Sequence, residues 1–372
     1  MLKDLKCSYY EILEYQFCFV FYGYICFCPG KNITGDEFTI EKQIHHTSIK
    51  NQYRSGTCWS FAALSFIESE LIRKQNKYFD LSEMFVVKYA LINKARKFVQ
   101  LHGHMKIASG SEINDAFKVL KEQGMITEDA FDGKNIKEDK HIHGEMNEVV
   151  SNYLNAIVEN KNGSLTPIWD EGFELVLNAY LGVIPETFEY EGKSYTPQIF
   201  GDMLDIQPDD YAYLTSFSHH PFYSEFILEV PDNWSWKSYF NVIIDDLTDV
   251  IDHAIKQGYS VIWAGDISEP GYSWEKGIAE LEGDTIVDQK TRQIGFNNYE
   301  TTDDHGMHIV GIAKNNEGKK FYLAKNSWGT DNAYEGYIYL SENYVLSKTI
   351  SLVVHKNALP KGIREKVENR PE

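Results

Sequence analysis

Cysteine is almost absent from the main body of this chain of 372 residues. Four of the five cysteines lie within the first 28 residues, and Cys58 is alone in everything that follows. The body therefore contains no internal disulfide, which excludes disulfides as a source of its stability. Cys58 is left either as a small buried apolar residue or as a reactive thiol.

Positive charge is also scarce. The chain has 36 Lys and Arg residues against 55 Asp and Glu residues, a formal net charge of −19 at pH 7. This charge disfavours nonspecific attraction to nucleic acid or anionic lipid, so we expect no nucleic-acid partner. Apolar residues are plentiful at 43%, enough for one large globular domain or two smaller ones with a substantial core.

One apolar run stands out, and it is too short to cross a membrane as a helix. It covers 13 residues, from Gln16 to Cys28, whereas a spanning helix needs about 20. Its length fits the core of a signal peptide and two lysines precede it, but two glutamates lie close by and no small-residue cleavage site follows. Residues 1–40 are therefore either a signal or anchor segment, or a poorly placed start or buried strand. The compartment, cytoplasmic or exported, depends on that choice.

The first third of the body has helical periodicity. Apolar residues recur at helical spacing over residues 58–75, 81–98 and 111–124. We expect Ser82 to cap the second of these helices and Ser111 to cap the third, which a glycine ends.

The last quarter of the chain changes to a strand pattern. Short β-rich runs, "MHIVGIAKN", "KFYLAKNSW" and "GYIYLSEN", are separated by turn-forming residues and predict an antiparallel meander. Before them, a helix is predicted to end at Gly258 and a strand to run from Tyr259 to Ala264. A helical half and a strand half that contribute to one site predict an α+β fold with a cleft between the layers.

Cys58 lies at the predicted N-terminus of the first helix, where exposed N–H groups and the helix dipole lower the pKa of a thiol. A lone cysteine at a helix start is more often structural, so the choice depends on other groups. Gln52, six residues upstream, could form a pair of oxyanion donors with the Cys58 backbone N–H. A general base and a group that orients it are also needed. Asn326 could hold a histidine, and Trp328 could shield that hydrogen bond from water.

Three separate motifs resemble the papain-type cysteine peptidases, in the same order along the chain. They are "NQYRSGTCWSF", "DHGMHIVGI" and "YLAKNSWG". The segments "LSEMFVV" and "SFSHHPFYSEFILEVPDNWSW", the chain length and the cysteine-free body narrow the resemblance to the bleomycin hydrolase and aminopeptidase C branch. The resemblance runs from about Thr47 to Lys366. It implies a papain-like two-layer fold over residues 41–372, with a helical half, an antiparallel β half, a catalytic cleft between them and a long insertion at about 131–239.

The stretch "DDHGMHIVGI" contains two histidines, and only one of them can face Cys58. Side chains of a strand alternate between faces, so His305 and His308, three residues apart, point in opposite directions. The family pattern of an Asp-His pair followed by a glycine matches Asp304 and His305. The resemblance thus implies that His305 is the base, paired with Cys58 as imidazolium and thiolate. His308 is then a core histidine, hydrogen-bonded within the sheet.

A metal site is the rival interpretation of this stretch. Its ligands would be Asp303, Asp304, His305 and His308. Ligands on opposite faces of a strand do not converge on one ion, so we expect no metal and no cofactor. Two other histidine pairs are assigned to the surface or to packing: His141 with His143, and His219 with His220.

The resemblance implies hydrolysis of peptide bonds through an acyl-thioenzyme. Cys58 attacks the carbonyl, and Gln52 with the Cys58 N–H stabilises the oxyanion. His305, oriented by Asn326, protonates the leaving amine and then activates water.

Peptides are the expected substrates, with Gly110 and Trp328 as candidate substrate-binding residues. Gly110 could equally be an ordinary turn glycine. Bleomycin hydrolases release residues from a free N-terminus because a C-terminal arm restricts the cleft, and the branch forms ring-shaped hexamers. Here the sequence ends at Glu372, about where that arm would begin. Aminopeptidase activity is expected, with endopeptidase or mixed activity as the alternative, and a homo-oligomer remains open.

Two further function classes remain as alternatives. A non-catalytic binding protein on a papain-like scaffold is disfavoured because all four catalytic residue types are present. A metal-dependent hydrolase would be inhibited by a chelator rather than by a thiol alkylator.

Overall fold

The structure is a computed structural model that describes residues 38–283 and 287–369. The apolar run from Gln16 to Cys28 lies outside these residues, so neither interpretation of it is addressed. Within the described ranges, no helix is both long enough and apolar enough to cross a membrane.

The described residues form ten α-helices and three short 3-10 helices. The α-helices are α1 (Cys58–Gln75), α2 (Glu83–Gln100), α3 (Ile113–Gln123), α4 (Gly144–Val158), α5 (Ile168–Leu181), α6 (Pro197–Leu204), α7 (Ile244–Lys256), α8 (Gln289–Asn297), α9 (Glu342–Lys348) and α10 (Lys361–Glu368). The 3-10 helices are η1 (Glu128–Ala130), η2 (Pro208–Asp210) and η3 (Lys356–Ala358).

Thirteen strands accompany these helices in the described residues. They are β1 (Phe38–Gln43), β2 (Phe188–Tyr190), β3 (Lys193–Tyr195), β4 (Tyr211–Thr215), β5 (Glu225–Ile227), β6 (Ser238–Asn241), β7 (Val261–Gly265), β8 (Tyr272–Ser273), β9 (Ile278–Ala279), β10 (His305–Asn315), β11 (Lys320–Lys325), β12 (Tyr337–Ser341) and β13 (Thr349–His355).

One large sheet contains all of these strands except the hairpin β2–β3. Its order is β5-β6-β4-β13-β7-β10-β11-β12-β9-β8, and β1 also pairs with β10. The predicted meander is confirmed, because β10, β11 and β12 pair antiparallel in sequence order. The sheet is not wholly antiparallel, since β4 pairs parallel with β6 and β9 pairs parallel with β12. In each of these two parallel pairs, the chain leaves the first strand and re-enters the sheet so that the second strand runs in the same direction.

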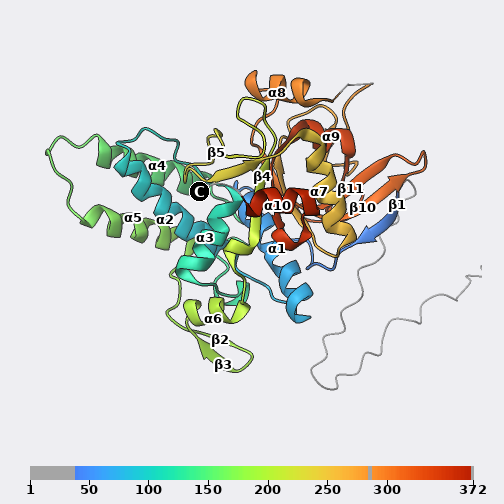
Figure 1. The fold of residues 1–372 in the computed structure, drawn as a ribbon. Coiled ribbons are helices and arrows are strands. Elements are labelled where there is room, and N and C mark those ends of the chain that lie inside the picture. The colour runs from blue at the N-terminus through green and yellow to red at the C-terminus, as the bar shows by residue number, and fades with distance from the viewer. Residues whose placement is uncertain (1–37, 284–286, 370–372) are drawn as a thin grey trace, which may run out of the picture. The chain divides into compact units, whose positions relative to one another are not determined.

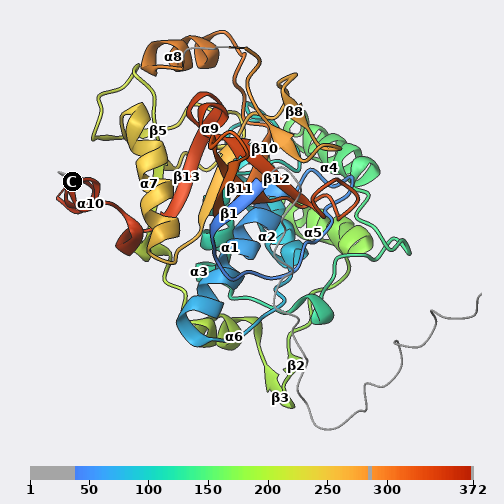
Figure 2. The ribbon, with the colours of Figure 1, turned by 90° about the vertical axis from the view of Figure 1, so that its right-hand side faces the viewer.

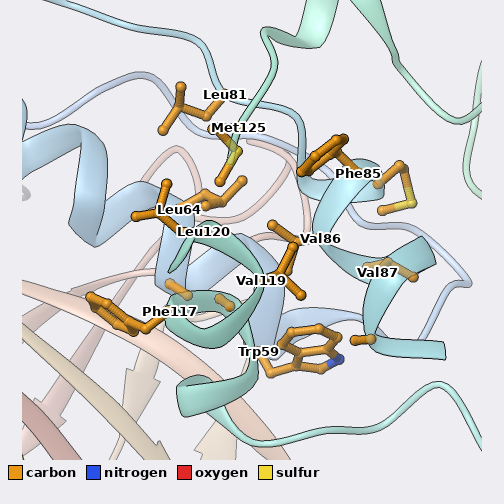
Figure 3. Packing of buried hydrophobic residues seen from close by; sticks show 14 of the residues in the cluster. Trp59, Leu64, Leu81, Phe85, Val86, Val87, Phe117, Val119, Leu120 and Met125 are labelled. Atoms are coloured by element: carbon orange, nitrogen blue, oxygen red, sulfur yellow. The ribbon is translucent and has the colours of Figure 1, made fainter. Parts of the chain in front are cut away.

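The helical half and the sheet have separate apolar cores. In the helical half, Trp59 and Leu64 of α1, Phe85 of α2 and Phe117 of α3 belong to one cluster of buried apolar side chains (Figure 3). A second core fills the space between the sheet and the helices α7 and α9. These two helices lie on the opposite side of the sheet from α2, α4 and α5 (Figures 1 and 2). The α+β layering predicted from the change of period is confirmed.

The first helices test the predicted caps. α1 begins at Cys58 as predicted, and the Ser82 hydroxyl accepts a hydrogen bond from the Phe85 N–H at the start of α2. The prediction for Ser111 is wrong, because α3 begins at Ile113 and Ser111 lies one residue too early. Its hydroxyl instead donates to an Asp115 carboxylate oxygen at 2.7 Å.

The segment predicted as an insertion, residues 131–239, contributes to both halves. Its helices α4 and α5 pack beside α2, and the hairpin β2–β3 lies next to α6 (Figure 2). The segment then supplies β4 and β5 to the sheet. The limits of this insertion, and the start of the peptidase domain at residue 41, stay predictions. The strand β1, which pairs with β10, already begins at Phe38.

Candidate active site

Cys58 is the first residue of α1 and lines a cleft of about 430 Å³. The same cleft is lined by Gln52, Gly110, His305 and Trp328. The structure therefore brings together side chains that are separated by up to 276 residues in the sequence, from Gln52 to Trp328. The backbone N–H of Cys58 belongs to the first turn of α1, whose donors have no partner within the helix.

His305 begins β10 and is held by Asn326, which follows β11. The His305 Nε2 lies 2.7 Å from Asn326 Oδ1, and the Asn326 side-chain N–H donates to the Tyr272 hydroxyl at 3.2 Å. The Ser327 backbone N–H, which can only donate, lies 2.7 Å from the same Asn326 Oδ1, so Oδ1 is the acceptor and His305 Nε2 the donor. The His305 Nδ1 is then left unprotonated, as a base requires.

Trp328 packs against this histidine. Its ring centroid is 4.8 Å from that of His305, and Trp274 and Tyr272 lie against the other parts of the indole, with centroids at 5.3 and 6.1 Å. The aromatic group shields the His305–Asn326 hydrogen bond from water. A role for Trp328 in contacting substrate stays a prediction.

Gln52 is oriented by the residue that follows Asn326. Its side-chain Oε1 accepts a hydrogen bond from the Ser327 hydroxyl at 2.7 Å, and its backbone N–H donates to the Ser327 carbonyl at 2.8 Å. With Oε1 occupied, the Nε2 donor of Gln52 remains for the cleft. The arrangement provides an amide donor near the N–H groups at the start of α1, which suits a developing oxyanion.

The protonation of the Cys58–His305 pair differs from the prediction of thiolate and imidazolium. Burial, with the nearby charges of Asp303 and Asp232, raises the pKa of Cys58 to about 12, although the Gly306 and Trp59 N–H groups lower it. Burial lowers the pKa of His305 to about 4, against the opposing effect of Asn326 and Asp304. In this cleft the cost of removing charge from water exceeds the contribution of the helix dipole. Both shifts favour the neutral thiol and the neutral imidazole over the predicted ion pair.

His308 lies on the other face of β10 from His305, as strand alternation predicts. It is completely buried, and its Nδ1 lies 2.8 Å from the Ser65 hydroxyl of α1. Burial lowers its pKa well below the usual range, so it is a neutral core residue. The prediction that it is a core histidine is confirmed, although its partner is a helix side chain. The rival metal ligands of this stretch do not converge.

The remaining histidine pairs differ from each other. His141 and His143 are buried, which places them in the packing of the helical half. His219 and His220 are partly exposed, and their Nε2 atoms lie 3.0 and 2.7 Å from the two oxygens of Glu229. Within the described part of the chain, these three side chains form the one group whose donor atoms could converge on a metal ion. The group lies apart from the residues that line the cleft.

Four acidic side chains in the cleft wall were not predicted as a group. The lining includes Glu112, Asp232, Asp303 and Asp304. The Asp303–Asp304 pair was visible beside His305 in the sequence. Glu112 and Asp232 come from other segments, and no local pattern connects them to the histidine.

Family models match nearly the whole described chain. Residues 36–166, which contain Cys58, match the papain family of cysteine proteases, and residues 168–372, which contain His305 and Asn326, match the Peptidase C1-like family. The chain belongs to the Peptidase C1-like family. In this C1-like peptidase, the thiol and the histidine thus come from segments that match two related family models.

Individual relatives agree with this assignment. Aminopeptidase C of Listeria innocua is 22% identical over 88% of this chain and 85% of its own length. Bleomycin hydrolase of Gallus gallus is 20% identical over 87% of this chain and 83% of its own length. The crystal structure of PepW from Lactobacillus rhamnosis matches the fold with a TM-score of 0.73 at 18% identity, covering 91% of this chain and 86% of that one. The C1-like peptidase described here is a cysteine peptidase of the aminopeptidase C and bleomycin hydrolase branch.

Proposed function

We propose that this cysteine peptidase is an aminopeptidase in which Cys58 is the nucleophile and His305 the general base. One observation carries the proposal: the His305–Asn326 hydrogen bond at 2.7 Å leaves Nδ1 as the acceptor, in the same cleft as a thiol at a helix N-terminus. Aminopeptidase C, the name of several relatives, supports removal of residues from the N-terminus. Peptides with a free amino end are the proposed substrates.

The reaction begins from the neutral pair. The Cys58 Sγ–H proton passes to His305 Nδ1 as the sulfur attacks the substrate carbonyl carbon. The oxygen becomes an oxyanion that accepts hydrogen bonds from the Cys58 N–H and the Gln52 Nε2. His305 then gives its proton to the leaving amine, the C–N bond breaks, and a thioester to Cys58 remains.

Water completes the cycle. His305 removes a proton from a water molecule that attacks the thioester, and the C–S bond breaks as the thiol regains its proton. Asn326 keeps the imidazole in one tautomer and orientation in both halves of the reaction. Gly110 is proposed to lie beside the non-primed part of the substrate.

The absence of a nucleic-acid partner and the formation of a homo-oligomer stay predictions. The net charge of −19 supports the absence of a nucleic-acid partner, and retention on DNA at physiological ionic strength would contradict it. Light scattering on the purified protein would measure whether it forms a homo-oligomer.

The test of this function compares wild type with Cys58→Ala on an alanine amide that carries a fluorescent leaving group. We expect Cys58→Ala to lose turnover while its circular dichroism and melting temperature stay near those of wild type. A thiol alkylator should inactivate wild type, and a chelator should not. Turnover by Cys58→Ala equal to that of wild type would overturn the proposed mechanism.

A further inference from the structure

The wall of the catalytic cleft is rich in carboxyl groups. Four carboxyl side chains line the cleft, and none of the described residues that line it is a lysine or an arginine. Buried carboxylates are normally paired with cations or with hydrogen-bond donors, because removing an isolated charge from water is costly. An acidic wall of this kind next to a nucleophile needs an explanation.

Glu112 is the most deeply buried of these acids, with 2% of its surface exposed. Its Oε2 accepts a hydrogen bond from the Tyr239 hydroxyl at 2.7 Å. Its Oε1 is buried, and no N–H group of the described residues donates to it. Asp303 lies beside it, and burial together with the Glu112 and Asp232 carboxylates and a hydrogen bond between the Glu112 and Asp303 side chains raises the pKa of Asp303 well above its usual range. Glu112 and Asp303 thus share a proton, and no lysine or arginine among the residues that line the cleft compensates the charge that the pair keeps.

Asp232 reaches the same wall from the turn that precedes β6, and Gly110 makes room for it. A Cβ atom on Gly110 would lie 2.1 Å from Asp232 Oδ2, so no other residue fits there without moving the carboxylate. Lys94 lies close to Gly110, but its ammonium donates to the carbonyl oxygens of Ala108 and Gly110. Lys94 and Asp232 attract each other electrostatically, but none of the ion pairs within 4 Å in the described part of the chain includes Asp232.

The position of these acids matches one group of an aminopeptidase substrate. In the first residue of a peptide, the α-nitrogen lies about 2.5 Å from the carbonyl carbon, from standard backbone geometry. A carboxylate that binds this nitrogen must therefore lie within several ångströms of the attacking sulfur. Asp232 and Asp303 line the same cleft as Cys58.

We propose that Glu112, Asp303 and Asp232 form the subsite that binds the free α-ammonium group of the substrate. An ammonium group supplies three N–H donors and one positive charge, and the lining residues include no lysine or arginine that could supply them. The subsite rests on the proposed aminopeptidase function and gives it a physical basis: an acylated N-terminus has neither the charge nor the donors. A lysine or arginine side chain one residue before the cleavage site offers the same cationic chemistry, so the test separates the two sources.

The test uses four fluorogenic amides and three proteins. The substrates are alanine amide, its N-acetyl derivative, and the N-acetylated dipeptide amides Lys-Ala and Leu-Ala. The proteins are wild type, Asp232→Asn and the control Asp249→Asn, which removes an exposed carboxylate of α7 outside the cleft lining. We expect wild type to prefer the free amide, and Asp232→Asn to reduce the ratio of kcat/KM for free over acetylated alanine amide about ten- to a hundredfold, mainly through KM. The control should keep the wild-type ratio.

Each other outcome overturns a different statement. A wild-type ratio near one would contradict the aminopeptidase function itself. A strong wild-type preference for the free amide that Asp232→Asn keeps in full would overturn the subsite and leave the function standing. A preference for acetyl-Lys-Ala over acetyl-Leu-Ala that disappears in Asp232→Asn would assign the acids to a substrate side chain instead of the α-ammonium group.

Discussion

Two groups of carboxyl side chains among the described residues differ in whether a cation of the protein contacts them. Around Lys50, Glu68 of α1 and Glu83 of α2 are 1% and 2% exposed, and the Lys50 ammonium lies 3.7 and 2.8 Å from them. In the cleft, Glu112 is equally buried and lies beside Asp303, with no lysine or arginine in the lining. The same sequence thus neutralises one acidic cluster with its own lysine and leaves the other open.

The difference separates a structural cluster from a binding site. Burial alone would lower the pKa of Lys50, but Glu83, Glu68 and Asp80 together raise it well above its usual range. The carboxylates of this cluster thus contact a cation that the protein itself supplies. Burial raises the pKa of both Glu83 and Glu112 to about 7. The two clusters therefore differ in whether a lysine contacts the carboxylates, and not in the pKa of the buried glutamate. We infer that the acids of the cleft are arranged to bind a ligand, and that Glu68 and Glu83 around Lys50 contribute to stability.

The largest expected effect comes from the two histidines of β10. Of these, His305 lines the cleft and His308 does not. His305→Gln should lower kcat about 10²- to 10⁴-fold, because glutamine cannot take the thiol proton. His308→Gln, the matched control on the opposite face, should keep kcat within a factor of a few, since His308 contacts Ser65 and not the cleft. Steady-state kinetics on alanine amide would check both. Equal losses in the two variants would contradict the assignment of the base.

A smaller effect is expected from removing the Lys50 ammonium. Lys50→Met should lower the free energy of unfolding by about 3–5 kcal/mol, because it strands Glu68 and Glu83 as buried charges without a partner. Lys256→Met, which removes an exposed ion pair with Asp252, should change stability by less than about 1 kcal/mol. Urea unfolding monitored by fluorescence measures both. A Lys50→Met protein as stable as the control would show that this lysine does not hold the cluster.

The smallest effect has the opposite sign and depends on pH. The pKa of Glu112 is raised from 4.5 to about 7 in the folded state. Its contribution to stability is therefore fully present below pH 4.5 and is lost as the pH rises through 7. Glu112→Gln removes this loss and can still accept the Tyr239 hydrogen bond. We expect the variant to gain about 1–3 kcal/mol over wild type at pH 8, with little gain at pH 5.

Urea unfolding at both pH values decides this prediction. A Glu112→Gln protein that is less stable than wild type at pH 8 would show that the protein already compensates the Glu112 charge. The contrast with Lys50→Met would then disappear.

Much of the site could be predicted from the sequence because its parts lie in contiguous motifs. Cys58 starts a helix of clear periodicity, and strand alternation separates His305 from His308 without any knowledge of the fold. The order of the motifs then assigned Gln52 and Asn326. The structure places all of these, except His308, in or beside one cleft.

The rest depends on tertiary contacts. Glu112, Asp232 and Asp303 come from three segments and meet only because Gly110 admits the Asp232 carboxylate. The pKa shifts that oppose the predicted ion pair of Cys58 and His305 have a related origin. The helix dipole is a local property and visible in the sequence, whereas the burial that outweighs it requires the surrounding walls.

The most direct test of the account is a crystal structure of Cys58→Ala with an unblocked alanine tripeptide bound. We expect the carbonyl carbon of the first residue to lie next to the side chain of residue 58, with its oxygen directed toward Gln52. The α-ammonium nitrogen should lie about 3 Å from carboxylate oxygens of Asp232 or Glu112. A peptide whose amino end extends past these acids, or lies outside the cleft, would contradict the claim that they recognise a free N-terminus.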